Sequence, residues 1–217
     1  MKKSDFSQTF SDNRRWMESY YKILKKLYED DTIMTNDDKA EIFEAFALKL
    51  CAQWEAFIQN LFIDCLNRDS SALAAYLQLK LSKHFSLDEC EALLFGTRYF
   101  DFDRIGDAKR HAKRILINRF NPFKFIKSKD AKVIDELFYI RNYLSHYSGY
   151  AERKLIDQVY SKHFRTRRFV HPGKFLTTAK TGDRYIRMSY YLFSMLAAAS
   201  DMRRALAPSR IRRLKAK

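Results

Sequence analysis

Residues 131–147, AKVIDELFYIRNYLSHY, are a strongly helical segment of the chain. Apolar residues recur in it every three or four positions, at Val133, Ile134, Leu137, Phe138, Ile140 and Leu144. This spacing predicts an amphipathic helix with one face in a core. Gly149 follows closely and is the predicted stop signal of the helix.

Three polar residues of this helix form a candidate site: Arg141, Asn142 and His146. Arg141 follows Leu137 and Phe138 by four and three positions, which puts it in the apolar stripe, where a guanidinium needs an anionic partner or a pocket. Asn142 and His146 share one side of the helix. Arg141 and His146 are about 140° apart around the axis and diverge, but two long side chains can still flank one phosphate, more easily if the last turn of the helix loosens. The structural alternative is a core acid paired with Arg141, and His146 as a cation at the helix C-terminus.

The rest of the chain has helical spacing almost throughout. Further helices are expected at about residues 13–29, 36–67, 71–83, 87–95, 107–119, 151–160 and 183–207. Asn36 and Asp183 are the predicted caps of the second and last of these segments, and Ser86 with Glu89 forms a capping box. With only five Gly and three Pro in 217 residues, the sequence predicts an all-α fold. We expect one domain over 1–217, with a basic tail at about 208–217 and a small basic β-hairpin or loop near 161–182.

Several classes of site are not supported. Cys51, Cys65 and Cys90 are widely spaced within helical patterns, which is typical of buried thiols in a reducing compartment. The histidines have no metal-ligand spacing, and no glycine-rich phosphate loop is present, so we expect neither metal nor cofactor. No apolar run reaches the length of a membrane span, and the start at Met1 lacks the apolar core of a signal peptide. A cytoplasmic protein without a membrane partner is expected.

Positive charge is concentrated in the last third of the chain. Lysine and arginine number 41 against 26 acidic residues, and residues 161–217 hold 15 of them against two acids. This imbalance favours a polyanion such as RNA, and Phe164 and Phe169 are placed to stack on bases. The expected RNA-binding residues are Lys162, Arg165, Arg167, Arg168 and Lys174. A solubilising tail or a contact with an acidic partner protein is the alternative.

The string Arg141-Asn142-Tyr143-Leu144-Ser145-His146 resembles the R-x4-6-H motif of HEPN-domain ribonucleases, in the form that has Asn after Arg. In addition, Trp54-Glu55 resembles a Trp-Glu pair on an early helix of the RiboL-PSP branch of that family. The resemblance spans about residues 37–206, although its specific part is the six-residue motif. It implies an antiparallel helical bundle, commonly a homodimer in which the two motif helices face each other.

The resemblance also implies a mechanism. The 2′-hydroxyl of RNA would attack its own phosphate and leave a 2′,3′-cyclic phosphate, without a metal. Arg141 would hold the phosphate, Asn142 would orient the phosphate or the imidazole, and His146 would exchange protons, because histidines titrate near neutral pH. Glu55 and Tyr147 are supporting residues; a structural partnership of Glu55 with Arg141 is favoured over direct chemistry.

Membership of this family would suggest a toxin or phage-defence ribonuclease with an antitoxin or another regulatory protein. Some family toxins carry R-x4-H-x-Y, whose tyrosine accepts adenylyl groups. Here Tyr147 follows His146 directly and Ser148 occupies the tyrosine's place, so that form of regulation is not expected. The competing functions are a non-catalytic nucleic-acid-binding protein that uses residues 161–217, and an interaction module for an acidic partner.

Overall fold

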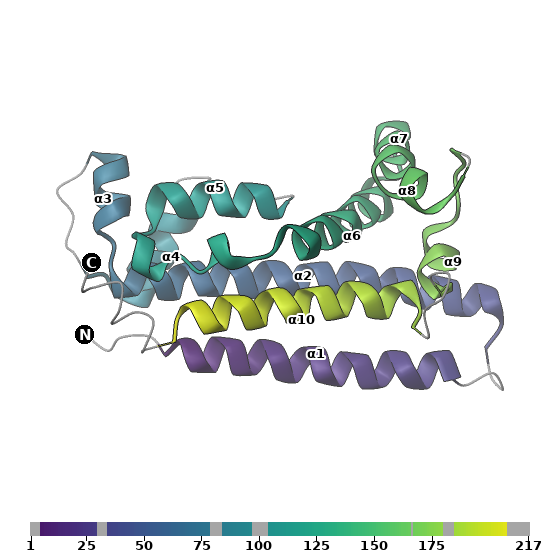
Figure 1. Ribbon diagram of the computed structural model, residues 1–217, viewed down its shortest axis with the longest axis horizontal. Coiled ribbons are helices and arrows are strands. Elements are labelled where there is room, and N and C mark those ends of the chain that lie inside the picture. The colour runs from purple at the N-terminus through teal and green to yellow at the C-terminus, as the bar shows by residue number, and fades with distance from the viewer. Residues whose placement is uncertain are drawn as a thin grey trace. The chain divides into compact units, whose positions relative to one another are not determined.

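The structure is a computed structural model that describes residues 5–29, 34–78, 84–96, 104–165, 167–179 and 185–207 (Figure 1). These residues are helical almost throughout, and no β-strand occurs among them. The nearest approach to a sheet is one isolated antiparallel bridge between Ala179 and Ile186. The predicted all-α fold is therefore confirmed. The expected Asp183 cap, residues 79–83 and the 208–217 tail lie outside the described residues.

Helices of very different length follow one another along the chain. In order they are α1 (Phe6–Glu29), α2 (Asn36–Arg68), α3 (Ser71–Leu77), α4 (Leu87–Gly96), α5 (Ile105–Ile115), η1 (Asn118–Phe120), η2 (Phe123–Phe125), α6 (Ser128–His146), α7 (Gly149–Leu155), η3 (Ile156–Tyr160), α8 (Ser161–His163), α9 (Pro172–Thr177) and α10 (Arg187–Ala205). The η1 and η2 segments are 3-10 turns, whereas η3 is a π-helical segment.

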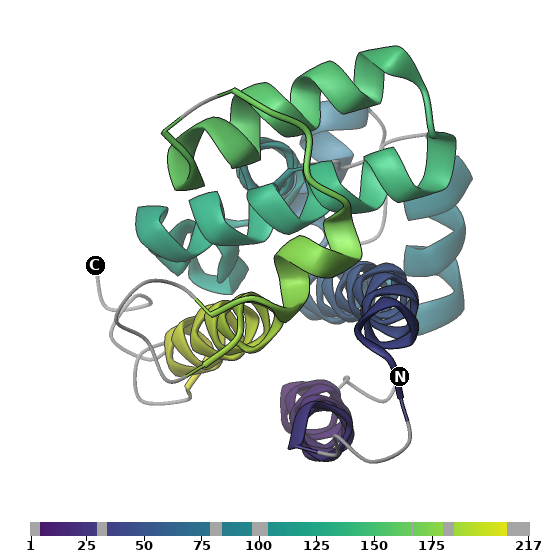
Figure 2. The ribbon, with the colours of Figure 1, turned by 90° about the vertical axis from the view of Figure 1, so that its right-hand side faces the viewer.

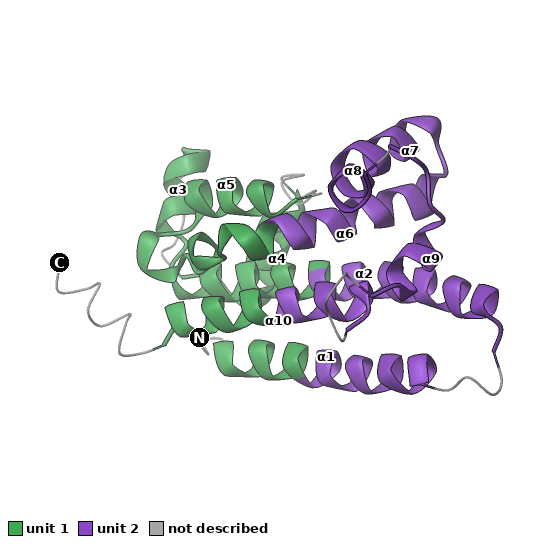
Figure 3. Cartoon of the chain, turned by 45° about the vertical axis from the view of Figure 1, so that its right-hand side comes forward, with its two compact units in different colours: residues 1–14, 55–131, 197–217 green, residues 15–54, 132–196 purple. Residues whose placement is uncertain are grey.

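The chain divides into two compact units, coloured separately in Figure 3. Unit 1 comprises residues 1–14, 55–131 and 197–217, and unit 2 comprises residues 15–54 and 132–196. The helices α1, α2, α6 and α10 each contribute residues to both units. A single domain over 1–217 stays a prediction.

Aromatic packing and ion pairs hold unit 1 together. The rings of Phe62 and Phe123 stack with centroids 4.1 Å apart, which joins α2 to η2. Arg119 pairs with the buried Asp69 at 2.8 Å. One face of α5 is fully apolar and packs inward through Ile105, Ala108, Ala112 and Ile115. Burial of this face, at about 25 cal/mol per Å² of apolar surface, holds α5 in place.

Unit 2 contains parts of α1, α2, α6 and α10 together with all of α7, η3, α8 and α9. Figure 2 shows the chain turned by 90° from Figure 1, and the part of α6 that belongs to this unit crosses α2 there. Ring contacts join α1 to α2 through Tyr20 and Phe46, 4.5 Å apart, and α1 to α10 through Tyr21 and Phe193, 5.3 Å apart. The buried thiol of Cys51 lies 4.0 Å from the carbonyl oxygen of Leu137, where α2 meets α6.

Helix starts agree with the sequence expectations in some places and differ in others. The capping box before α4 is confirmed, because Glu89 N–H donates to Ser86 Oγ and Ser86 N–H donates to Glu89. The predicted Asn36 cap of α2 is wrong. The hydroxyl of Thr35 accepts from Asp38 N–H at 3.1 Å, so Thr35 caps the helix and Asn36 is its first residue. The α1 helix begins at Phe6, earlier than the expected residue 13.

A β-hairpin near 161–182 is not what the described part of this segment forms. Pro172 starts a helix, α9, because its ring fixes φ near the helical value and its missing N–H is not needed in a first turn. Phe175 and Leu176 are both completely buried, which an alternating strand pattern would not allow. Residues 167–171, ahead of α9, have no regular structure, so the loop alternative holds there.

Gly173 fixes α9 against α2. A Cβ atom at Gly173 would lie 2.1 Å from the carbonyl oxygen of Ala40, so only glycine allows this close approach. Gly173 N–H donates to Glu44 Oε1 at 2.8 Å, and the Nδ1 atom of His171 lies 3.0 Å from the same oxygen. The start of α9 is thus held by backbone, carboxylate and imidazole together.

Candidate functional site

The helix α6 buries the apolar stripe predicted for it. Ile134, Leu137 and Ile140 are fully buried, and Phe138 and Leu144 nearly so. Val133, at the margin of the stripe, is half-buried. The stripe orients α6, so that its remaining faces carry the polar residues of the motif.

The predicted stop signal of α6 is wrong, because Gly149 is the first residue of α7. The helix ends instead at His146, and Tyr147 adopts the left-handed conformation with φ of 44°. Tyr147 N–H donates to the carbonyl oxygen of Tyr143 at 2.8 Å, and the side chain of Ser148 caps α7 by accepting from Ala151 N–H. The turn therefore takes only two residues and places His146 at a sharp corner.

Arg141 and Asn142 are joined by a hydrogen bond. Nη1 of Arg141 donates to Oδ1 of Asn142 at 2.9 Å, and both side chains are half-buried. Arg141 thus lies at the border of the buried stripe rather than deep within it. The bond orients the guanidinium, a role for Asn142 that sequence reasoning did not anticipate. A guanidinium presents its N–H donors as a planar fork, a geometry suited to a phosphate.

His146 is exposed at the last position of α6. The next residue, Tyr147, is 68% exposed. Both are accessible to a large substrate. Glu55, half-buried on α2, belongs to unit 1, whereas Arg141 belongs to unit 2, and their partnership stays a prediction.

An aromatic cluster joins the motif helix α6 to the chain that follows α8. We call this part of the chain, which contains Arg165, Arg167 and Arg168, the basic segment. The ring of Tyr143 lies 5.5 Å from that of Tyr147 and 5.4 Å from that of Phe169. Burial raises the pKa of Tyr143, with smaller contributions from Glu152, Tyr147 and Glu44, so the phenol is neutral at physiological pH. Phe169 is 39% exposed and thus keeps part of its ring available for stacking.

The five expected RNA-binding residues are all exposed, but three of them form ion pairs. Lys162 pairs with Glu136 at 3.1 Å, Arg167 with Asp157 at 3.5 Å and Lys174 with Asp37 at 2.9 Å. The pairs of Arg167 and Lys174 are exposed and contribute at most about 1 kcal/mol each, so a polyanion can displace their acids, whereas the partner of Lys162 is nearly buried.

The other two expected RNA-binding residues are Arg165 and Arg168. Arg165 is exposed, and the guanidinium of Arg168 lies over the ring of Phe164, 5.2 Å from its centroid. An arginine held over an aromatic ring can still donate to a phosphate.

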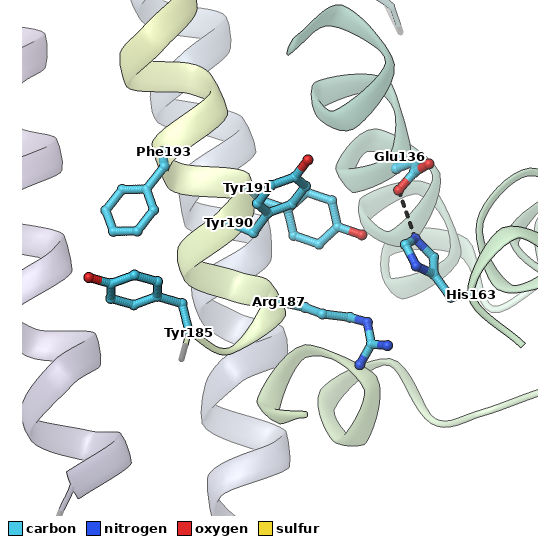
Figure 4. A pocket seen from close by; sticks show the side chains of 7 residues that line it. All are labelled: Glu136, His163, Tyr185, Arg187, Tyr190, Tyr191 and Phe193. Atoms are coloured by element: carbon cyan, nitrogen blue, oxygen red, sulfur yellow. Dashed lines mark hydrogen bonds and ion pairs between the residues drawn. The ribbon is translucent and has the colours of Figure 1, made fainter. Parts of the chain in front are cut away.

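Seven residues of unit 2 line a hollow of about 90 Å³ along α10 (Figure 4): Glu136, His163, Tyr185, Arg187, Tyr190, Tyr191 and Phe193. The imidazole of His163 points at Glu136, with Nε2 3.1 Å from Oε2. Sequence reasoning missed this pair because its members lie 27 positions apart, on α6 and α8. Glu136 is nearly buried and also pairs with Lys162, which makes it a structural connection between the two helices.

Arg187 is committed to the same region of unit 2. Its guanidinium lies over the ring of Phe175 at 4.5 Å and donates to the hydroxyl of Thr178 and the carbonyl oxygen of Ala179. Burial lowers its pKa from the usual value for arginine, although it stays charged at neutral pH. Arg187 thereby ties the end of α9 to the start of α10.

Within the described residues, no group of three or more His, Cys, Asp or Glu is arranged to hold a metal ion. Among the same residues, no helix has both the length and the apolar character needed to cross a membrane. Comparison of the chain with protein-family models, with curated proteins and with solved structures finds no match.

Proposed function

We propose that the protein is a metal-independent endoribonuclease of the HEPN type whose active site is built from Arg141, Asn142 and His146. The observation that carries the proposal is the hydrogen bond from Arg141 Nη1 to Asn142 Oδ1, at 2.9 Å, on the helix that ends at the exposed His146. A guanidinium oriented in advance can stabilise the charge on a phosphate, and an accessible imidazole can act as acid or base, so the two groups together can support phosphodiester transfer without a metal.

The reaction follows from these groups. The 2′-hydroxyl of RNA loses its proton to a base as its oxygen attacks the adjacent phosphorus. The bond from phosphorus to the 5′-oxygen breaks, and that oxygen takes a proton from an acid. The products are a 2′,3′-cyclic phosphate and a 5′-hydroxyl. In a homodimer, the His146 residues of the two subunits supply the base and the acid, while Arg141 stabilises the charge on the phosphate.

Substrate approaches the motif along the aromatic and basic segment. Phe169 contacts Tyr143, which is the residue directly after Asn142. Arg165 and Arg168 are exposed and lie close to Phe169 in the sequence. In this proposal Phe169 and Tyr147 stack on bases while the arginines hold phosphates. The biological role we propose is a cytoplasmic toxin or phage-defence enzyme that an antitoxin or another regulatory protein restrains.

A nuclease assay in excess EDTA tests the proposal, with tRNA and total RNA as substrates. Replacing His146 by Ala should lower the cleavage rate about a hundredfold or more, as expected for the loss of a general acid or base. His84→Ala is the matched control, because His84 is an exposed histidine in unit 1. Wild type and His84→Ala should both yield 2′,3′-cyclic ends by mass spectrometry. Equal background cleavage by wild type and His146→Ala would refute the catalytic proposal.

The second candidate function is RNA binding without cleavage. Two contacts favour this function: Arg168 lies over Phe164, and Phe169 lies against Tyr143. These residues could stack on bases and hold phosphates without any role for the imidazole of His146. RNA that binds tightly but remains intact in every cleavage assay would support this second function.

A further inference from the structure

The helix α5 carries an unusual density of positive charge. Residues 104–127 contain eight lysines and arginines against a single acid, Asp107. Residues 1–160 as a whole are nearly neutral, so this local excess is hidden in an average over the chain. Because α5 packs its apolar face into unit 1, its charged residues are confined to the opposite side.

Three cations lie together at the centre of that side. Arg110, Lys113 and Arg114 are all exposed and fall within an arc of about 100° at 3.6 residues per turn. We call these three residues the α5 basic face. Arg110 contacts Asp107, whereas Lys113 and Arg114 form no ion pair with any residue in the part of the chain that the structure describes.

Four of the other five cations of residues 104–127 have structural partners; one is Lys124, which donates to the carbonyl oxygen of Asn118 at 3.2 Å. Lys109 donates to the carbonyl oxygen of Ile126 at 2.7 Å, Arg119 pairs with Asp69, and Lys127 pairs with Asp201 at 3.2 Å. The structure therefore uses these residues for folding. The α5 basic face is what remains for a ligand.

The positive charge of the α5 basic face affects the pKa of the neighbouring His111. Burial lowers the pKa of His111, and the charges of Arg114 and Arg110 lower it further. A cation near a helix C-terminus stabilises the helix by about 0.3–1 kcal/mol. This effect explains why one or two of the three cations of the α5 basic face are present. Arg110 and Arg114, however, are like charges four positions apart, which destabilises an isolated helix. An anion bound across the face would remove this repulsion.

We propose that the α5 basic face binds the phosphate backbone of RNA, as a contact surface of unit 1 separate from the basic segment of unit 2. The inference rests on the proposed function only in taking RNA as the polyanion. Two arginine forks and one lysine on a single exposed arc match successive phosphates, and they carry no information about base sequence. RNA cleaved at the motif would thus also be held at a second place on the protein.

Fluorescence anisotropy with a labelled single-stranded RNA tests the inference across a series of salt concentrations. The titration uses the full chain with His146→Ala, so that the RNA stays intact, and is repeated with His146 present. Replacing Arg110, Lys113 and Arg114 together by Gln should weaken binding. The slope of log K against log salt should flatten by about two units, at roughly 0.7 per lost contact to a single strand.

The matched control replaces Lys22, Lys25 and Lys26 by Gln. These residues are exposed on α1, have the same spacing and remove the same charge, and Lys25 already pairs with Glu29. Their replacement should leave the slope unchanged. A parallel variant, Arg165, Arg167 and Arg168 to Gln, reports on the basic segment of unit 2 independently.

An unchanged affinity and slope in the α5 variant would overturn the inference. So would a variant that loses binding to anionic lipid vesicles or to an acidic polypeptide while RNA binding is retained. Failure of the proposed nuclease function gives a different result, since wild type would then bind RNA through α5 without cutting it.

Discussion

Tyr147 occupies a backbone conformation that residues with a Cβ rarely adopt. Its φ of 44° lies in the left-handed region, which costs a non-glycine residue about 1–2 kcal/mol. Helices commonly end on a glycine in this conformation. The chain places a bulky tyrosine there, next to the exposed His146, and the neighbouring Tyr143 ring compensates part of the cost by contact. Strained residues of this kind cluster at functional sites.

Two substitutions at Tyr147 distinguish the effect of backbone strain on stability from the effect of losing the aromatic ring. Tyr147→Gly and Tyr147→Ala both remove the contact with Tyr143, but only glycine relieves the left-handed strain. We expect the Gly variant to have the higher free energy of unfolding, by about 1 kcal/mol. Urea denaturation of the two variants measures this difference directly. An Ala variant as stable as the Gly variant would mean that the turn relaxes to another conformation.

Among the elements, α9 depends on one close contact. Gly173→Ala would bring a Cβ atom to 2.1 Å from the carbonyl oxygen of Ala40, which is backbone and cannot rotate away. We expect a loss of about 1–3 kcal/mol of stability, as for other overpacked sites. Gly106→Ala is the control, because nothing lies within 4 Å of its Cβ position, on the first turn of α5. That change should leave stability equal or up to about 1 kcal/mol higher.

Chemical denaturation followed by circular dichroism measures both alanine variants. Limited proteolysis then locates the damage, since Gly173→Ala should expose the segment around α9 to cleavage first. Equal stability of the two variants would show that α2 and α9 can separate without cost.

Elements with a strong apolar periodicity could be predicted from the sequence. Features that depend on contacts between residues far apart in the chain could not. The stripe from Ile134 to Leu144 identified α6, and the capping box at Ser86 identified the start of α4. The helix α9 was hidden because its short sequence also fits a hairpin, and only burial of Phe175 against neighbouring elements decides between them. Local turn signals likewise pointed to Gly149, although the end of α6 is set at Tyr147.

The candidate site was predictable in composition but not in arrangement. The motif named Arg141, Asn142 and His146, but a string of letters does not show that Asn142 accepts from Arg141. Nor did it show Tyr143 as the contact between α6 and Phe169, which is 26 residues further along the chain. The α5 basic face escaped notice because acids elsewhere in residues 1–160 balance its charge.

For the whole molecule, the proposed mechanism requires two chains. Tyr147 and Tyr150 are 68% and 65% exposed at the corner between α6 and α7, and large exposed aromatics are typical of interface centres. We expect sedimentation equilibrium at micromolar concentration to give twice the chain mass of 25.9 kDa. Tyr150→Lys should shift the protein toward monomer, whereas Tyr28→Lys, at an exposed tyrosine of α1, should not. A wild type that sediments only as a single chain would contradict this prediction.

The π-helical segment Ile156–Tyr160 has a consequence for how the chain tolerates changes in length. A π turn holds one residue more than the α turn it replaces, so the segment is equivalent to a one-residue insertion between α7 and α8. Deleting a single codon there would restore ordinary helical winding and leave the following residues facing nearly the same way, because the wider π turn already absorbs the extra residue. Lys162 and His163 would then still face Glu136, and the sequence before residue 156 would keep its register. We therefore expect the chain to tolerate the loss of one residue in this segment better than a loss within an ordinary α-helix such as α6.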